Sequence, residues 1–309
     1  MSDDDQQLTH SDIQKLLEPI DVSLDDYTPE QLQILNFVLE NDAHTLDVFL
    51  SSCKSPPCLD FTDSLEIYEE KPKKNPIVQP LLLIAAERGS IDLFEVLVKH
   101  GATLTIETRN GSNALDWACY GGSLPMVKHL LSKYGEDIFS PYRANPLGYV
   151  PVGQAIFAGH TDIIHFFHTK FDLDRQTSQR TYLDTHPVQD AICRGNLATV
   201  RFMVENVHNG FPLKPDSKDF LSAFTSASPY PDIFTYLLIA FAPSGFHLPP
   251  TIFPTPEILT LIKQWKEQMN IVSLRLMCLR LIKVNHNPFG VKIPNNFPEM
   301  LLRWPIIFD

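Results

Sequence analysis

The sequence lacks long apolar runs, an excess of basic residues and the cysteine patterns that mark several classes of protein. No apolar run approaches the ~18 residues that span a bilayer, and the N-terminal MSDDDQQLTH is acidic rather than a secretory signal. A net charge of −12 argues against binding to nucleic acids or anionic membranes. Five cysteines without CxxC spacing indicate reduced thiols. We therefore expect a soluble protein of the cytoplasm, or of the cytoplasm and nucleus.

Motifs of common enzymes are also missing: the sequence has no GxxxxGK[ST], GxGxxG, HExxH or GxSxG. His165 and His168 would share a helix face near His160, but no third metal ligand is evident. Cys53 and Cys58 have no matching Cys or His elsewhere. We expect no cofactor, no metal and no catalytic role, although a catalytic cysteine beside a histidine in a cleft stays open.

What is present is a pattern of short apolar helices in pairs. In residues 80–104, Leu82–Ala86 form one apolar helical face and Leu93–Val98 form a second, with Gly89 in the break between them. Gly101 offers the left-handed conformation at which helices commonly end. A helical hairpin of this kind cannot bury its apolar face alone, so we expect neighbours of the same form.

The hairpin recurs along the chain. Gly89 is followed by Gly122, Gly159 and Gly195, at spacings of 33, 37 and 36 residues. Each glycine follows a short apolar helix and precedes one rich in Val, Ile, Leu and Phe, as in AAERGSIDLFEVLV and AICRGNLATVRFMV. An irregular helical bundle is the alternative, which the near-constant period disfavours.

This period and pattern resemble the ankyrin repeat. Parts of the family's T-P-L-H-x-A motif occur at 113–118, 151–155 and 186–191. The resemblance implies an all-α ankyrin-repeat solenoid with about six repeats, the terminal ones degenerate. In such repeats a histidine after the turn glycine, as His160 is here, makes hydrogen bonds in the turn.

The chain divides by composition as well as by period. Thr28-Pro29-Glu30-Gln31 has the form of a capping box with proline at the first helical position, so we expect the repeats to begin there.

Residues 54–77 break the period with a Pro-rich, charged loop in which we expect one short helix near 62–70. Whether this insertion contacts a partner or only fills space stays open. The predicted segments are 1–27, an acidic segment with a short helix; 28–241, the repeats; 242–270, a Pro-rich connector and amphipathic helix; and 271–309, a small helical domain.

The predicted helix at 273–282 carries a narrow apolar stripe. Leu274, Cys278 and Ile282 are spaced by four residues, with Met277 and Leu281 beside them. A narrow stripe with a small thiol at its centre suits insertion into the groove of another protein.

This stripe resembles the elongin-binding helix of the SOCS box, in which a small residue is followed by Leu, then Cys and an aliphatic residue at steps of four. The resemblance implies that Leu274 enters an apolar pocket on elongin C, with Cys278 and Ile282 beside it. The alternative is an apolar C-terminal cap without a partner.

The second half of the SOCS box recruits a cullin through a Leu-Pro-Φ-Pro stretch, and the match here is partial. Phe297 and Pro298 fit the second pair, and Leu301 and Trp304 fit the positions downstream. Asn295-Asn296 stand where the family has Leu-Pro, so elongin binding is better supported than cullin binding.

Hairpin tips and the residues just before the turn glycine line the concave surface of a solenoid and have no packing role. Tyr and Arg at such positions are typical of binding hot spots, although some of them can belong to an ordinary solvated surface. The predicted substrate-binding residues are Glu87, Arg88, Arg109, Asn110, Tyr120, Arg143, Phe157, Arg180 and Arg194.

Together the repeats and the terminal box resemble the ankyrin repeat and SOCS box family, whose members are substrate receptors of cullin–RING ubiquitin ligases. The resemblance implies a non-enzymatic adaptor that binds elongin B/C, a cullin–RING scaffold and an unidentified protein substrate. One rival is a plain ankyrin scaffold with a structural cap at 271–309. A second is an enzyme with its site in the 54–77 insertion or among the histidines.

Overall fold

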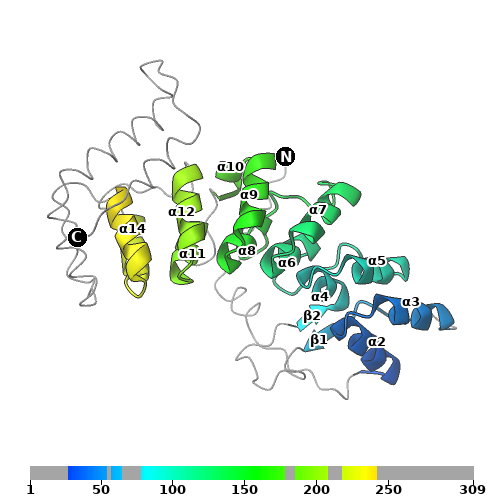
Figure 1. The fold of residues 1–309 in the computed structure, drawn as a ribbon. Helices are drawn as coiled ribbons and strands as arrows, with labels where there is room; N and C mark the ends of the chain where they lie inside the picture. The colour runs from blue at the N-terminus through cyan, green and yellow to red at the C-terminus, as the bar shows by residue number, and fades with distance from the viewer. Residues whose placement is uncertain (1–26, 54–56, 65–77, 178–184, 208–217, 242–309) are drawn as a thin grey trace. The chain divides into compact units, whose positions relative to one another are not determined.

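The computed structural model describes residues 27–53, 57–64, 78–177, 185–207 and 218–241 (Figure 1). The chain divides into two compact units, Met1–Phe211 and Pro212–Asp309, and each is described by itself. The segments predicted at 242–270 and 271–309, and all but the last residue of the segment predicted at 1–27, lie outside the described residues. Among the residues that are described, no helix is both long and apolar enough to cross a bilayer.

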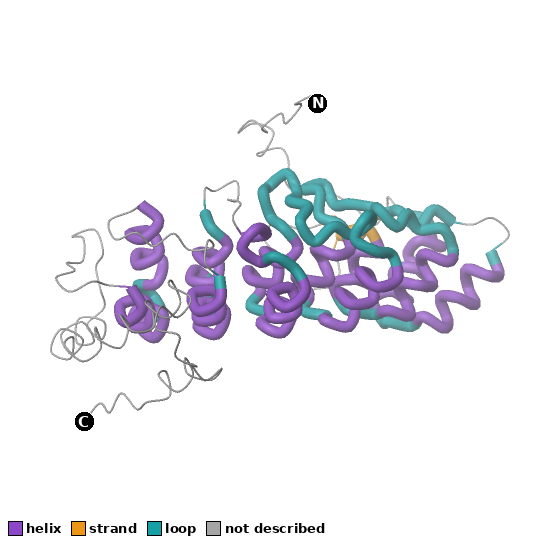
Figure 2. The backbone as a smooth tube through the Cα atoms, turned by 90° about the horizontal axis from the view of Figure 1, so that it is seen from above, coloured by secondary structure: helices purple, strands orange, loops and turns teal. Residues whose placement is uncertain are grey.

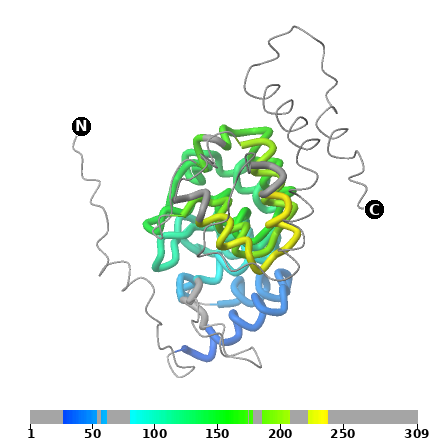
Figure 3. The backbone as a smooth tube through the Cα atoms, turned by 90° about the vertical axis from the view of Figure 1, so that its left-hand side faces the viewer, coloured from blue at the N-terminus to red at the C-terminus, as the bar shows by residue number. Residues whose placement is uncertain are grey.

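The first unit consists of helices in successive pairs, and its helical repeats follow the predicted pattern. The first helices of neighbouring pairs pack on one another, from α4 to α6, α8 and α11. Seen end-on, the helices from α6 to α12 lie over one another, as stacked pairs must (Figure 3). The helices are α2 (Pro29–Leu39) with α3 (Ala43–Ser52), α4 (Leu81–Glu87) with α5 (Ile91–Lys99), α6 (Ala114–Gly121) with α7 (Leu124–Lys133), α8 (Pro151–Ala158) with α9 (Thr161–Lys170), the short α10 (Leu173–Thr177), and α11 (Pro187–Cys193) with α12 (Leu197–Asn206).

Helix α2 begins where the sequence predicts. Thr28 accepts a hydrogen bond from the backbone N–H of Gln31 at 3.3 Å, and the Gln31 side chain accepts one from the backbone N–H of Thr28 at 2.9 Å. Pro29 occupies the first helical position, where its missing N–H costs nothing. The predicted capping box is therefore confirmed.

The core lies between the two helices of each pair and between neighbouring pairs. All of the residues from Leu81 to Ala86 are buried, because α4 contacts both α2 and α6 as well as its own partner α5. The second helices bury one face only, as Leu93, Phe94 and Leu97 do in α5. A helix that is apolar all round is thus explained by neighbours on every side.

Carboxylates on the second helices link one pair to the next. Glu95 of α5 accepts hydrogen bonds from His129 at 2.6 Å and Tyr134 at 2.8 Å, and it also pairs with Lys133. Burial by itself would raise the pKa of Glu95, but these hydrogen bonds outweigh it and lower the pKa below the usual value. This cluster holds α5 to the end of α7.

The turn glycines are required both by their backbone and by the next repeat. Gly122 and Gly159 have φ of 81° and 89°, in the left-handed region that other residues avoid. A Cβ on Gly122 would overlap the ring of His160, and one on Gly159 would overlap the Asn196 amide. The Nε2 atom of His160 lies 2.9 Å from the carbonyl oxygen of Tyr120, so the hydrogen bond of His160 reaches the end of α6 in the preceding repeat and not its own turn.

The insertion contributes a two-stranded antiparallel sheet that the all-α prediction did not include. Strand β1 (Thr62–Ser64) pairs with β2 (Val78–Pro80), with Thr62 opposite Pro80. The short helix expected near 62–70 is therefore wrong over 62–64. Pairing across a long insertion depends on a distant segment, and such pairing leaves no local period in the sequence.

The base of the insertion is fastened to the loop after α5. Asp60 accepts hydrogen bonds from the backbone N–H of Thr103 at 2.8 Å and from its hydroxyl at 2.5 Å. The two connections hold this end of the insertion beside the second pair of helices.

The second unit contains one described pair of helices, α13 (Lys218–Ala227) and α14 (Pro231–Phe241), where the sequence predicts the last repeat. The rings of Phe224 and Phe234 meet edge to face at 5.3 Å between centroids. The turn between these helices has no glycine, and in it the Tyr230 N–H donates a hydrogen bond to the carbonyl of Ala227 at 2.9 Å.

Candidate functional site

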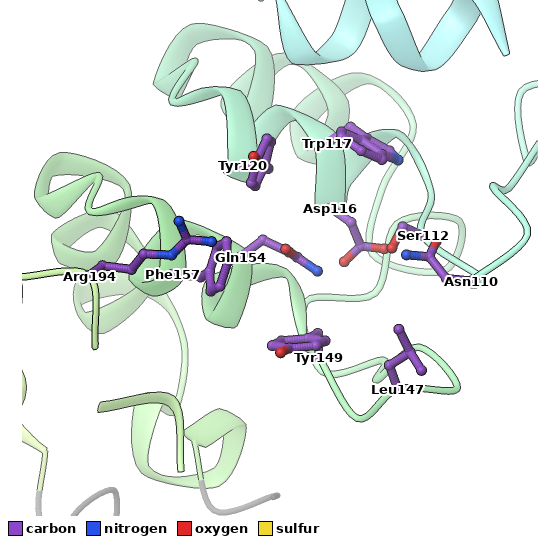
Figure 4. A pocket seen from close by; sticks show the side chains of 10 residues that line it. All are labelled: Asn110, Ser112, Asp116, Trp117, Tyr120, Leu147, Tyr149, Gln154, Phe157 and Arg194. Atoms are coloured by element: carbon purple, nitrogen blue, oxygen red, sulfur yellow. The ribbon is translucent and has the colours of Figure 1, made fainter. Parts of the chain in front are cut away.

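A cavity of about 270 Å³ opens on the side of the first unit formed by the first helices and the loops that precede them (Figure 4). Helices α6 and α8 form two of its walls, the loops before them form a third, and the end of α11 supplies one residue. Its lining residues are Asn110, Ser112, Asp116, Trp117, Tyr120, Leu147, Tyr149, Gln154, Phe157 and Arg194.

The repeat itself brings the helical side chains together. Trp117 and Tyr120 stand five and two residues before the turn glycine of their repeat, and Gln154 and Phe157 stand at the same positions in the next repeat. Residues three apart share a helix face. Because α6 packs directly on α8, the two pairs of side chains adjoin on one surface.

The loop residues are held by hydrogen bonds within and between loops. The loops run along one side of the row of helices (Figure 2). Asn145 accepts hydrogen bonds from the backbone N–H groups of Leu147 and Tyr149, both at 3.0 Å, which shapes the turn before α8. The Asn145 amide donates to the Ser112 hydroxyl at 3.0 Å, which joins this loop to the preceding one. The cavity wall is therefore pre-formed.

Aromatic rings form a continuous wall. Tyr120 lies 5.5 Å from Trp117 and 6.3 Å from Phe157 between ring centroids, and Tyr149 lies 6.5 Å from Phe157. The guanidinium carbon of Arg194 lies 3.9 Å from the centre of the Phe157 ring, a cation–π contact. Rigid aromatic side chains and arginine are the groups that dominate binding energy in protein interfaces.

Asp116 is a buried acid at the bottom of this cavity, with only 2% of its surface exposed. One carboxylate oxygen accepts the backbone N–H of Asn113 at 2.9 Å, as the third residue of the capping box of α6. The other oxygen, Oδ1, has no hydrogen-bond partner among the described residues. Burial raises the pKa of Asp116 to about 7; the Asn113 hydrogen bond and the charge of Arg143 lower it in part, and Glu107 raises it further.

Residues 52–142 match the family model of ankyrin repeats, with three copies. This segment consists of ankyrin repeats. None of the curated proteins compared with the chain matches it significantly. Ankyrin repeats are in general non-catalytic modules that bind other proteins, and the match favours such a role for this segment. Helix α6 and its loop lie inside the matched segment, and α8 continues the stack beyond it.

Four of the predicted substrate-binding residues come together in the cavity. Asn110, Tyr120, Phe157 and Arg194 belong to three successive helix pairs and all line the same space. Asn110 precedes Gly111, whose φ of 73° gives the tight turn that the Asn-Gly pair predicts. The rule that hairpin tips and residues before the turn glycine face one surface therefore holds for these four.

The other predicted residues do not line the cavity. Arg88 donates hydrogen bonds to the carbonyl of Leu39 at 2.5 Å and of Val38 at 3.3 Å, so its guanidinium closes the C-terminal end of α2. Glu87 is half-buried in the same repeat. The role predicted for both in binding stays a prediction.

The predicted loop arginines do not line the cavity either. Arg143 forms an ion pair with Glu107 at 2.7 Å and donates to the carbonyl of Gly111 at 3.2 Å, which ties two neighbouring loops together. Arg109 is exposed beside the cavity residue Asn110. Arg180 lies outside the described residues.

Sequence reasoning missed several residues of the cavity. Trp117 and Gln154 each stand three residues before a predicted residue, Tyr120 or Phe157. Because residues three apart share a helix face, this spacing would have found both of them. The residues that were not predicted are Ser112, Asp116, Trp117, Leu147, Tyr149 and Gln154.

All of the predicted residues of the C-terminal box lie outside the described residues, and their roles stay predictions. They are Leu274, Met277, Cys278, Leu281 and Ile282 for elongin, and Phe297, Pro298, Leu301 and Trp304 for a cullin.

Two of the histidines noted in the sequence pack against an aromatic ring, and the thiol of Cys119 in α6 is buried. His165 and His168 both lie against Phe202 of α12, at 6.0 and 5.6 Å between ring centroids. Burial raises the pKa of Cys119 well above its usual value, so it is a neutral thiol at physiological pH. No group of three or more metal-ligating side chains occurs in the described part of the chain.

Proposed function

We propose that this protein is the substrate-recognition adaptor of an elongin B/C–cullin–RING ubiquitin ligase. The ankyrin repeats bind a protein substrate, and the C-terminal segment binds elongin C. Catalysis is indirect, because holding a substrate beside a charged ubiquitin-conjugating enzyme raises its effective concentration.

The observation that carries the proposal is the stripe of Leu274, Cys278 and Ile282 after the last repeat. Spacing by four places the three side chains on one helix face, with the small thiol in the middle. A face this narrow and apolar fits an apolar groove on a partner such as elongin C. A cullin is a less well supported partner, because Asn295-Asn296 depart from the pattern that recruits it.

The substrate-binding half of the proposal is supported by the cavity between α6 and α8. Its walls are pre-formed, so binding costs little ordering of the protein. Aromatic and arginine side chains concentrate there, as in interface hot spots. A substrate that presents a side chain to this cavity would be held between loops that hydrogen bonds already fix.

The adaptor role is tested by measuring elongin B/C binding to the full chain. We expect the double variant Leu274→Asp/Cys278→Asp to lose binding by at least about a hundredfold, since two charges would enter an apolar interface. The matched control, Arg275→Asp/Arg280→Asp, changes two positions of the same predicted helix outside the stripe and should keep binding. Unchanged elongin binding by the Leu274/Cys278 variant would overturn the proposal.

A further inference from the structure

The cavity holds buried polar groups that the chain itself leaves without partners. Asp116 and Trp117 are 2% and 6% exposed, and both line the space between α6 and α8. Asp116 Oδ1 and Trp117 Nε1 have no hydrogen-bond partner in the parts of the chain that are described. Buried polar atoms of this kind lower stability unless something satisfies them. Of the two, Asp116 Oδ1 is an acceptor that belongs to a residue of the cavity lining, so it points to a ligand that donates a hydrogen bond.

The lining identifies the chemistry of that ligand. A carboxylate oxygen attracts a cation, and the faces of aromatic rings attract a cation as well. Three rings besides Trp117 line the same cavity as the carboxyl group: Tyr120, Tyr149 and Phe157. The walls are otherwise apolar enough to cover an alkyl chain. A cationic head on an aliphatic stem satisfies both the carboxylate and the rings.

We propose that the cavity between α6 and α8 binds a lysine side chain of the partner protein, with its ammonium group at Asp116 Oδ1. Lysine fits better than arginine, because an ammonium group needs only Oδ1, whereas a bidentate contact to guanidinium would have to share Oδ2 with the Asn113 N–H. Gln154, at the centre of the cavity in Figure 4, offers an amide oxygen as a second acceptor. The inference rests on the proposed binding of a protein by the repeats, and it does not depend on elongin.

Two positive charges oppose a cation in the cavity. Arg143, whose charge acts on Asp116, is neutralised in part by its ion pair with Glu107. Arg194 belongs to the cavity lining. It is exposed and stacks on Phe157, so water screens its charge, whereas Asp116 is almost fully buried. In Figure 4, Gln154 stands between the Arg194 and Phe157 pair and the Asp116 carboxyl. The acidic end of the cavity therefore lies away from the guanidinium. The net charge of −12 further favours the approach of a basic segment.

The proposal is tested with peptides selected from a random displayed library against the full chain. We expect lysine to recur at one position of the peptides that bind. Replacing that lysine with methionine, which keeps the apolar stem, should weaken binding about tenfold or more, as expected for a buried charged hydrogen bond. A replacement with arginine should also weaken binding.

A double-mutant cycle assigns the effect to Asp116. In the variant Asp116→Asn, the lysine and methionine peptides should bind with nearly equal affinity. Asp190→Asn is the matched control, because Asp190 is a buried acid on the neighbouring first helix α11 that does not line the cavity; it should keep the preference for lysine. Thermal unfolding of each variant shows whether the fold is retained.

Three results would overturn the proposal: no recurring lysine among the selected peptides, a preference for acidic peptides, or an Asp116→Asn variant that still discriminates lysine from methionine. Binding of elongin B/C, measured in parallel, is independent of these results. The lysine site can therefore fail while the adaptor role stands, and the adaptor role can fail while the lysine site stands.

Discussion

At the scale of single residues, the unusual feature is a pair of buried acids on the first helices of the repeats. Burial is the main cause that raises the pKa of Asp116 to about 7 and that of Asp190 to about 6. A surface that only had to stack would be more stable with apolar residues at these positions. Acids kept here at a cost in stability are typical of binding sites.

The pH dependence of stability should reveal the raised pKa of Asp116. Between pH 4 and 7 the folded protein holds a proton on Asp116 that the unfolded chain has released, so stability falls as pH rises through this window. A pKa change from 3.8 to about 7 corresponds to at most about 4 kcal/mol. Relative to the wild type, Asp116→Asn should therefore gain stability from pH 5 to pH 8.

Urea unfolding of both proteins at several pH values measures this difference. The exposed Asp162 of α9 supplies a control for the same Asp-to-Asn change outside the core. Parallel stability curves for the wild type and Asp116→Asn would show that the raised pKa of Asp116 is wrong.

At the scale of elements, the turn between the two helices of a pair decides how pairs stack. Gly122 ends α6 in the left-handed conformation, and the His160 ring of the next pair covers the space where a side chain would stand. Gly135, after α7, has nearly the same φ, 83° against 81°, but nothing lies within 4 Å of its missing Cβ. Comparison of the two glycines therefore separates the cost of a left-handed backbone from the cost of a clash with the next repeat.

Alanine at these two glycines should have different effects on stability. Gly135→Ala should cost about 1 kcal/mol, the penalty of a left-handed backbone for an alanine. Gly122→Ala should cost about twice as much or more, since the His160 ring must also move and its hydrogen bond to Tyr120 is put at risk. Chemical unfolding of the two variants measures both costs. Equal losses of unfolding free energy in the two variants would mean that the ring of His160 moves aside without a cost.

At the scale of the whole molecule, the repeats and the C-terminal segment are proposed to have separate tasks. In a repeat array, stability comes from contacts between neighbouring repeats, so the array of the first unit does not need a distant segment. A C-terminal box that binds elongin should accordingly be separable from the repeats. A structural cap, the rival prediction, should not be.

Removal of residues 271–309 distinguishes the two. We expect the shortened chain to keep the urea midpoint of the repeats and its binding to lysine peptides, and to lose elongin B/C. A shortened chain whose repeats unfold at clearly lower urea, with no loss of a partner, would favour the plain scaffold. The wild type and Leu274→Asp/Cys278→Asp are the reference proteins for both measurements.

Sequence alone was sufficient to predict the helix pairs, because their signals are local. The spacing of Gly89, Gly122, Gly159 and Gly195 and the capping box at Thr28 follow from short stretches of chain. The same local patterns predicted which surface Tyr120 and Phe157 would share. The match of residues 52–142 to the ankyrin-repeat model agrees with these predictions.

Only the tertiary structure decided which of these side chains form a site. Asn110, Asp116, Tyr149, Gln154 and Arg194 come from successive repeats, and no local pattern says that they surround one cavity. The structure also paired β1 with β2 and turned Arg88 toward the end of α2. Helices and turns depend on neighbours in sequence, whereas a cavity and a strand pair depend on contacts between distant segments, which packing alone brings together.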